Sequence, residues 1–306
     1  MKKNKLLYIL ESFRANQWIK NLVVYTAIVF SGKLFNPELF TVTTYAFLIF
    51  VVLSSVSYLL NDIIDYNYDR KHPIKKFRPI ASGKLSIQEA TFLAFVLMLI
   101  TLIVSLFFSL KFFILAVIFI LLHFFYSLYL KKYAVIDILS ISFSFMIRAF
   151  AGEIVTGYHI PIWLILTIFF GSLFIASVKR HAEFVIHGSE TRTSLNFYKE
   201  HMLNFLTNTF ATTTIISYSL YAYLEKPPNI YSPFNDYFSR VLPNFEARRW
   251  LMITIPFVVY GISRYAQLLY TKEEGERPEK LITKDIPLIA TIFLWGATII
   301  MLIYIL

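Results

Sequence analysis

The chain has 306 residues, of which 57% are apolar and only 16% are charged. Soluble globular domains carry about 25% charged residues, so this composition excludes an ordinary soluble fold and indicates a polytopic membrane protein. The formal net charge of +10 would suggest a nucleic-acid partner in a soluble protein, but membrane topology and anionic lipids explain it here, so we expect no nucleic-acid binding.

The first twenty residues, MKKNKLLYILESFRANQWIK, begin with three lysines among apolar positions. They lack the long apolar stretch and the small-residue cleavage site of a secretory signal peptide. We therefore expect residues 1–20 to form an amphipathic lead-in helix on the inner membrane surface.

Nine apolar runs approach the length of about 20 residues that a helix needs to cross a bilayer. They lack the alternation of membrane β-strands, so they predict an all-α membrane protein, a bundle of nine transmembrane helices forming a single integral membrane domain over residues 1–306. The runs lie at residues 21–35, 41–60, 88–109, 112–130, 134–156, 160–178, 203–224, 250–270 and 285–306.

Most of the 29 Lys and Arg residues fall in the segments that share a side with the N-terminus. By the positive-inside rule, the N-terminus is cytoplasmic, the C-terminus lies outside, and residues 225–249 form an extracytoplasmic loop. We expect the cell membrane as the location. The chain has no cysteine, which excludes disulfides, a thiolate nucleophile and Cys-based zinc sites.

Three aspartates follow the second apolar run, in the segment NDIIDYNYD at residues 61–69. If the helix continues, Asp62, Asp65 and Asp69 fall within about 60° of its circumference. Carboxylates so close repel one another unless a cation lies among them, and hard oxygen ligands suit Mg²⁺. We therefore predict a magnesium site with Asn61 as a neutral amide ligand.

A basic segment, RKHPIKKFRPIASGK, comes directly after the aspartates. Its cations, including Lys75 and Arg78, could bind phosphate oxygens that the metal leaves uncovered, so the two segments together describe a diphosphate site. The alternative, in which acids and bases merely pair in a solvated loop, does not explain why the acids share one face.

The same residues resemble a known family. NDIIDYNYD resembles the NDxxDxxxD motif of the UbiA superfamily of intramembrane prenyltransferases, and DRKHPIKKFRPIASG resembles its continuation in the branch of decaprenyl-phosphate phosphoribosyltransferases. RANQWIKN, YSLYLKKYAVIDI, MIRAFAGE, SLFIASVKRHAE and SRYAQLLY are similar to further segments of that branch. The resemblance covers nearly the whole chain and implies a UbiA-like bundle.

One position departs from other members of the superfamily. Aromatic prenyltransferases of this fold carry a second Asp-rich motif after the sixth helix, whereas this chain has Lys179, Arg180, His181 and Glu183 there. Acidic side chains bind a metal ion, whereas cationic side chains bind a phosphate directly. The change therefore suits a substrate with a phosphate that no metal covers, either a donor with an additional 5-phosphate or an acceptor that is itself a phosphate.

The resemblance implies a Mg²⁺-dependent transfer of 5-phosphoribosyl from phosphoribosyl diphosphate to a long polyprenyl phosphate, with diphosphate released on the cytoplasmic side. Asp62, Asp65 and Asp69 would be the catalytic residues. On this interpretation the substrate-binding residues are Gln17, Lys20, Lys75, Arg78, Tyr126, Lys131, Arg148, Lys179, Arg180 and Glu183.

Several alternatives stay open. Arg148 falls inside a predicted span, and its charge there is explained equally well by pairing with Glu153 or another buried acid and by contact with the substrate. Tyr126 and Lys131 could equally be an interfacial aromatic and a snorkelling lysine. A prenyl diphosphate transferase acting on an aromatic acceptor and a transporter with charged gates are rival functions, and homo-oligomerisation is left open.

Overall fold

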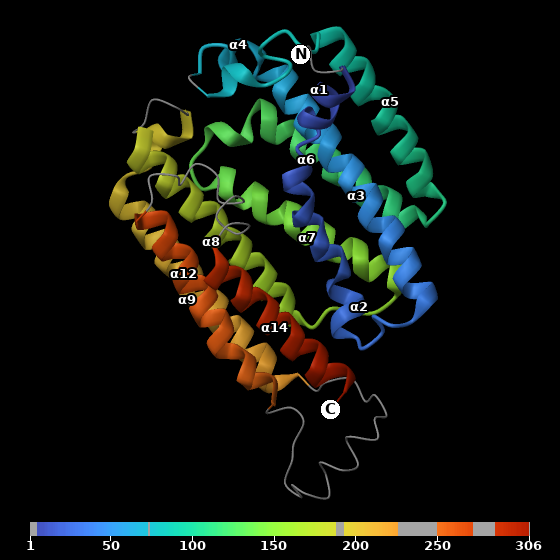
Figure 1. Cartoon of the computed structure of the whole chain (residues 1–306), viewed down its shortest axis with the longest axis vertical. Helices are drawn as coiled ribbons and strands as arrows, with labels where there is room; N and C mark the ends of the chain where they lie inside the picture. Colours follow the sequence, from blue (N-terminus) through green and yellow to red (C-terminus); the bar gives the residue numbers. More distant parts are fainter. Residues whose placement is uncertain (1–4, 73, 188–192, 226–249, 272–284, 306) are drawn as a thin grey trace, which may run out of the picture. The chain divides into compact units, whose positions relative to one another are not determined.

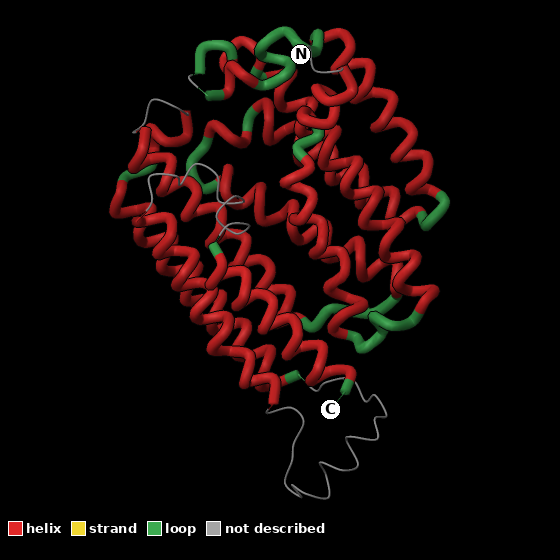
Figure 2. The backbone as a smooth tube through the Cα atoms, in the orientation of Figure 1, coloured by secondary structure: helices red, strands yellow, loops and turns green. Residues whose placement is uncertain are grey.

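The computed structural model describes residues 5–72, 74–187, 193–225, 250–271 and 285–305 (Figure 1). Within these ranges the secondary structure is helical and contains no strand (Figure 2). The prediction of an all-α protein is therefore confirmed. Residues 226–249, which hold most of the expected extracytoplasmic loop, lie outside the described ranges.

Seven helices within the described ranges are long and apolar enough to cross a membrane. The chain is thus a multi-pass membrane protein, but the predicted count of nine spans is not confirmed. The seven spans lie in α3 (Pro37–Ile64), α5 (Ile87–Leu106), α6 (Leu110–Leu128), α7 (Ile136–Thr156), α8 (Ile162–His187), η5 (Leu251–Thr254) continued by α12 (Ile255–Thr271), and α14 (Ile286–Tyr304).

The two remaining predicted spans differ from the other seven. Residues 21–35 do not form one long helix, because the 3₁₀ helix η1 (Ala15–Tyr25) is followed only by the short α2 (Thr26–Phe30). Residues 203–224 lie in the long helix α9 (Glu200–Leu224), in which Thr, Asn and Ser interrupt the apolar residues. The shorter elements are α1 (Lys5–Ser12), α4 (Tyr66–Asp69), η2 (Lys75–Phe77), η3 (Leu130–Lys132) and η4 (Thr193–Phe197).

The described helices form two compact units. The first contains residues Met1–Tyr25 and Thr41–Gly157, and the second contains Thr26–Phe40 and Tyr158–Leu306. The single integral domain and the membrane-surface position of the lead-in segment stay predictions.

Aromatic packing between α3 and α6 forms the centre of the first unit. Phe50 is fully buried and makes edge-on contacts with Phe112 and Phe119, at centroid distances of 6.0 and 5.2 Å. Such edge-to-face pairs add to the free energy that burial of the rings provides. This packing fixes the two helices whose ends carry most of the candidate site.

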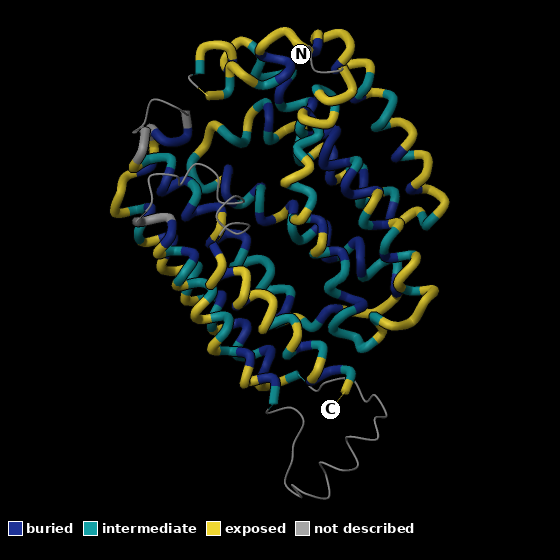
Figure 3. The backbone as a smooth tube through the Cα atoms, in the orientation of Figure 1, coloured by how far each residue is buried: buried dark blue, intermediate teal, exposed yellow. Residues whose placement is uncertain are grey.

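The outer face of α5 carries large apolar side chains that nothing within the unit covers. Phe92, Phe95, Leu99 and Ile103 are all exposed, as the yellow segments along this helix show (Figure 3). A helix with a continuous exposed apolar face suits contact with lipid rather than water.

The N-terminal segment packs unusually closely on α7. A Cβ atom at Gly152 would lie 1.9 Å from the backbone oxygen of Val24, so only glycine fits this position of α7. The side chain of Arg148, one turn earlier on α7, donates to Oδ1 of Asn21 at 2.7 Å. These two contacts with α7 fix the position of η1 in the first unit.

Candidate active site

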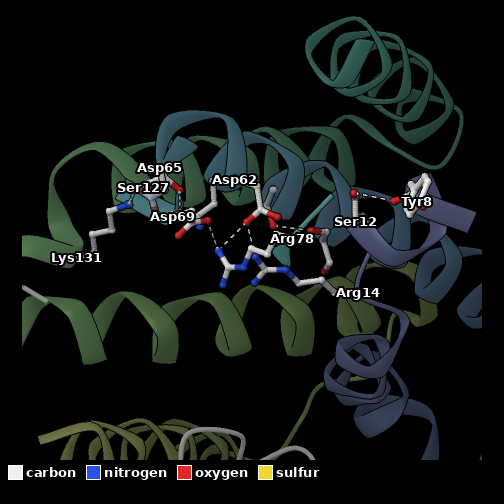
Figure 4. A network of polar contacts seen from close by, with 12 residues as sticks. Tyr8, Ser12, Arg14, Asp62, Asp65, Asp69, Arg78, Ser127 and Lys131 are labelled. Atoms are coloured by element: carbon white, nitrogen blue, oxygen red, sulfur yellow. Dashed lines mark hydrogen bonds and ion pairs between the residues drawn. The ribbon is translucent and has the colours of Figure 1, made fainter. Parts of the chain in front are cut away.

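The three aspartates lie where α3 ends and α4 begins. The backbone stays nearly helical across this junction, since Asp65 N–H donates to the oxygen of Asn61 and Asp69 N–H donates to the oxygen of Asp65, at 2.9 and 2.8 Å. Asp62 and Asp69, two turns apart, therefore lie on the same side of the chain, and both side chains are only 3% exposed (Figure 4).

Arg78 joins these two carboxylates. Its Nη1 atom donates to Oδ1 of Asp62 at 3.1 Å and to Oδ2 of Asp69 at 2.6 Å (Figure 4). The loop that carries Arg78 is held in place by Ile80 and Leu85, which are almost completely buried. Burial of these apolar side chains fixes the loop, so the guanidinium is held between the two aspartates.

Asp65 faces a different partner. Its Oδ1 accepts from Nζ of Lys131, which follows α6, at 2.5 Å. One turn before Lys131, Ser127 donates to Oδ1 of Asn61 at 3.1 Å. Tyr126, beside Ser127 at the end of α6, is half-buried. The end of α6 and the η3 turn that follows it thus contact the first and fifth residues of the segment NDIID, Asn61 and Asp65.

A third cation, Arg14, contacts Asp62, although the sequence alone did not predict it as a site residue. Its Nη2 atom donates to Oδ1 of Asp62, the oxygen that Arg78 also contacts (Figure 4). Arg14 is the first residue of the RANQWIKN segment, so a cation opening this segment was the available signal.

Burial changes the acid strength of Asp69. Loss of hydration raises the pKa of its carboxyl above the ordinary value; Arg78 opposes this shift and the nearby Asp62 adds to it. The raised pKa means that the neighbouring cations do not fully offset the cost of a buried charge.

The oxygen atoms present fit a divalent cation, although they are arranged as ion pairs. In the described part of the chain, no three acidic or histidine side chains converge on one point as a ready metal cage. The carboxylates of Asp62 and Asp69 supply hard oxygen ligands, and Mg²⁺ commonly takes one or two carboxylates and completes its shell with water and phosphate oxygens. A metal would take the positions that the guanidinium groups hold.

Three further predicted site residues belong to the first unit. Gln17 and Lys20 are half-buried on η1, and Lys75 is half-buried in η2, the short helix before Arg78.

Arg148 is only 3% exposed, and its side chain donates hydrogen bonds to neutral oxygens rather than to Glu153. It bonds Asn21, the backbone of Ser144 and, at 3.3 Å, the hydroxyl of Ser54. The rings of Phe119 and Phe145 also lie 4.7 and 5.5 Å from its guanidinium carbon. The charge is thus stabilised by dipoles and aromatic faces.

The second charged segment belongs to α8 in the second unit. Arg180 is 2% exposed and pairs with Glu183, one turn later, at 2.5 Å. Lys179 is half-buried beside it. The acid within this segment therefore partners the buried arginine of the same helix.

Comparisons with known proteins place the chain in one family. Residues 22–183 match the UbiA prenyltransferase family. The decaprenyl-phosphate phosphoribosyltransferase of Mycolicibacterium smegmatis is 33% identical over 97% of this chain and 92% of its own length. The protein of the same name from Corynebacterium glutamicum is 32% identical over 99% of this chain and 89% of its own.

A solved structure shares the fold. A UbiA homolog from Archaeoglobus fulgidus, bound to GPP and Mg²⁺, has a TM-score of 0.70 over 97% of this chain and 99% of its own. Its sequence identity is 16%, so this likeness concerns the fold alone.

Proposed function

This chain belongs to the UbiA prenyltransferase family, and we propose that it transfers a 5-phosphoribosyl group from phosphoribosyl diphosphate to a polyprenyl phosphate. The relatives from M. smegmatis and C. glutamicum are transferases by name and match almost end to end, so the chain is an enzyme of the transferase class. The donor, the acceptor and the use of Mg²⁺ are parts of the proposal.

The observation that carries the proposal is the cluster of Asp62, Asp69 and Arg78. It combines buried carboxylates, which suit a divalent cation, with a guanidinium, which suits phosphate. A donor with a diphosphate group needs both kinds of partner. Asp62, Asp65 and Asp69, with Asn61, are the proposed metal ligands.

When bound, Mg²⁺ supplies positive charge that stabilises the departing diphosphate. The residues of the chain do the remaining work. If a divalent cation took the carboxylates that they now contact, Arg78 and Lys131 would be available to hold phosphate oxygens. Lys75, with Gln17 and Lys20 on η1, completes the proposed donor set. These fixed charges orient the donor so that C1 of the ribose faces the acceptor.

The acceptor needs little activation. A polyprenyl phosphate is already an anion at neutral pH, so its oxygen can attack C1 of the ribose without a general base. The bond from C1 to the diphosphate breaks as the bond to the lipid phosphate forms, and the diphosphate leaves with its electron pair. Positioning and electrostatic stabilisation then supply most of the rate.

The charges of the second unit are proposed to serve the same reaction. Lys179, Arg180 and Glu183 are proposed to bind substrate, because the two cations of this segment suit a phosphate. Tyr126 and Arg148 were also assigned to the substrate; the hydrogen bonds of Arg148 to neutral oxygens favour a positioning role for it.

The proposed location is the cell membrane, with the aspartates on the cytoplasmic side. This orientation is supported by the concentration of Lys and Arg in the segments on the side of the N-terminus and of the NDIIDYNYD motif.

A substrate-choice assay tests the proposal. Purified protein in detergent or liposomes receives Mg²⁺, phosphoribosyl diphosphate labelled in the ribose, and polyprenyl phosphate. We expect label to enter the lipid phase, with one diphosphate released for each lipid labelled. The opposite result would be an unlabelled lipid phase together with consumption of prenyl diphosphate and an aromatic acid, which would assign the rival prenyltransferase function.

A further inference from the structure

Arg14 has an unusual backbone conformation. It lies between α1 and η1, and its φ angle of 52° falls in the left-handed region that residues other than glycine rarely adopt. Such conformations persist where the surrounding structure imposes them, and they gather at functional sites. Here the conformation accompanies the placement of one guanidinium at a buried carboxylate.

Two guanidinium groups meet at the same atom. Arg14 and Arg78 both donate to Oδ1 of Asp62, while Arg78 also reaches Asp69. Together these are two positive and two negative charges, so the group is balanced. A divalent cation entering it adds two positive charges, which repel both guanidinium groups unless they find another anion.

This charge balance suggests an exchange of partners. On the basis of the proposed function, we infer that Arg14 is a further donor-binding residue. It occupies Asp62 in the metal-free protein and moves its guanidinium to the diphosphate oxygens when a divalent cation takes the carboxylate. The planar guanidinium donates two parallel hydrogen bonds, which fits a phosphate group as well as it fits a carboxylate.

The position of the side chain favours this movement. The side chain of Arg14 is 27% exposed, whereas that of Asp62 is 3% exposed, so the guanidinium approaches the carboxylate from the open side. Its carbon Cζ lies 5.0 Å from the ring centre of Tyr58, one turn before Asp62 on α3. The ring face attracts the cation and can hold it near the site during the exchange.

The segment that carries Arg14 has other attachments to α3. Trp18 donates from Nε1 to Oγ of Ser55 at 3.2 Å, and Oδ1 of Asn21 accepts from Ser54 at 3.1 Å. These bonds do not involve Arg14. Its side chain can therefore change partner while η1 stays on α3.

Metal binding tests the inference without any turnover. Binding of Mn²⁺, a paramagnetic substitute for Mg²⁺, is measured by electron paramagnetic resonance on the purified wild type, Arg14→Gln and Arg14→Lys. The affinity for inorganic diphosphate is then measured at saturating Mn²⁺. The matched control is Lys5→Gln, because Lys5 is also an N-terminal cation in an ion pair, but its partner is Glu89 rather than an aspartate of the site.

The two affinities should change in opposite directions. In Arg14→Gln, Mn²⁺ alone should bind several-fold more tightly because a competitor has left Asp62, while diphosphate should bind about tenfold more weakly because a charged hydrogen-bond donor is missing. Arg14→Lys should keep the wild-type affinity for Mn²⁺ within about twofold and bind diphosphate more weakly. Lys5→Gln should behave as the wild type.

Other results overturn the inference in distinguishable ways. Unchanged affinities in both Arg14 variants, or a parallel weakening of Mn²⁺ and diphosphate binding, would mean that Arg14 only supports the structure. If the wild type itself binds no Mn²⁺, the metal site of the proposed function fails, and this inference fails with it.

Discussion

Arg148 donates a hydrogen bond from Nε to Oδ1 of Asn21 at 2.7 Å, across 127 positions of the sequence. Both side chains are buried, and the bond attaches the N-terminal segment to α7. A charged arginine in the interior is costly unless its N–H groups are bonded, so this contact fixes where η1 lies and, with it, Gln17 and Lys20.

Arg148→Met should therefore destabilise the protein. The change leaves Asn21 and Ser54 without a charged donor, and we expect the free energy of unfolding to fall by about 3 kcal/mol. Thermal unfolding of the purified protein in detergent measures this effect. Because Gln17 and Lys20 lie on η1, any rise in the KM for phosphoribosyl diphosphate should accompany this loss of stability, as expected of a residue that positions others through packing. A normal stability together with a large rise in KM would instead indicate direct contact with the donor.

Gly152→Ala should destabilise the first unit through a steric clash. The new Cβ would lie 1.9 Å from the backbone oxygen of Val24, and backbone cannot move aside as a flexible side chain can. We expect a loss of about 3 kcal/mol or more, visible as a lower melting temperature. Gly296→Ala in α14 is the matched control, because nothing lies within 4 Å of its added Cβ. This control should be neutral or slightly stabilising, since alanine favours helix; equal melting temperatures for the two variants would contradict the close contact.

Removal of divalent metal should abolish transfer. With the metal chelated, Arg14 and Arg78 remain paired with Asp62 and Asp69, and the diphosphate lacks its counter-charge. Activity measured after treatment with EDTA should fall to background and return when Mg²⁺ is added in excess. Inorganic diphosphate with Mg²⁺ should raise the melting temperature more than either does alone, because each supplies the charge that the other needs. Full activity in EDTA would exclude the proposed role of the aspartates as metal ligands.

The sequence was informative where local periodicity decides the structure. The spacing of Asp62 and Asp69 predicted a shared face, and the nearly continuous helix brings both carboxylates to Arg78. The lengths of the apolar runs likewise predicted an all-α membrane fold. In lipid every backbone N–H and C=O group must be bonded within the protein, and a helix satisfies them locally. The ion pair of Asp65 with Lys131, 66 residues away, is a contact that spacing cannot predict.

Tertiary contacts explain the other differences. Residues 21–35 are apolar enough to suggest a spanning helix, yet the bonds of Asn21 to Ser54 and Arg148 and the close contact at Gly152 accompany a 3₁₀ segment and the short helix α2. Arg148 was expected either to pair with an acid or to contact the substrate. Besides Ser144 on its own helix, its neutral partners Asn21 and Ser54 come from η1 and α3, which only the folded chain brings to α7.

The most direct test of the account is turnover by Asp62→Asn and Asp69→Asn, each compared with Glu89→Gln, which removes an exposed carboxylate at the start of α5. We expect each aspartate variant to transfer the phosphoribosyl group at least about 100-fold more slowly at saturating donor while keeping the wild-type melting temperature within a few degrees, because charge stabilisation at the departing diphosphate is lost. Glu89→Gln should retain the wild-type rate. Folded aspartate variants that turn over at the wild-type rate would contradict the proposed site.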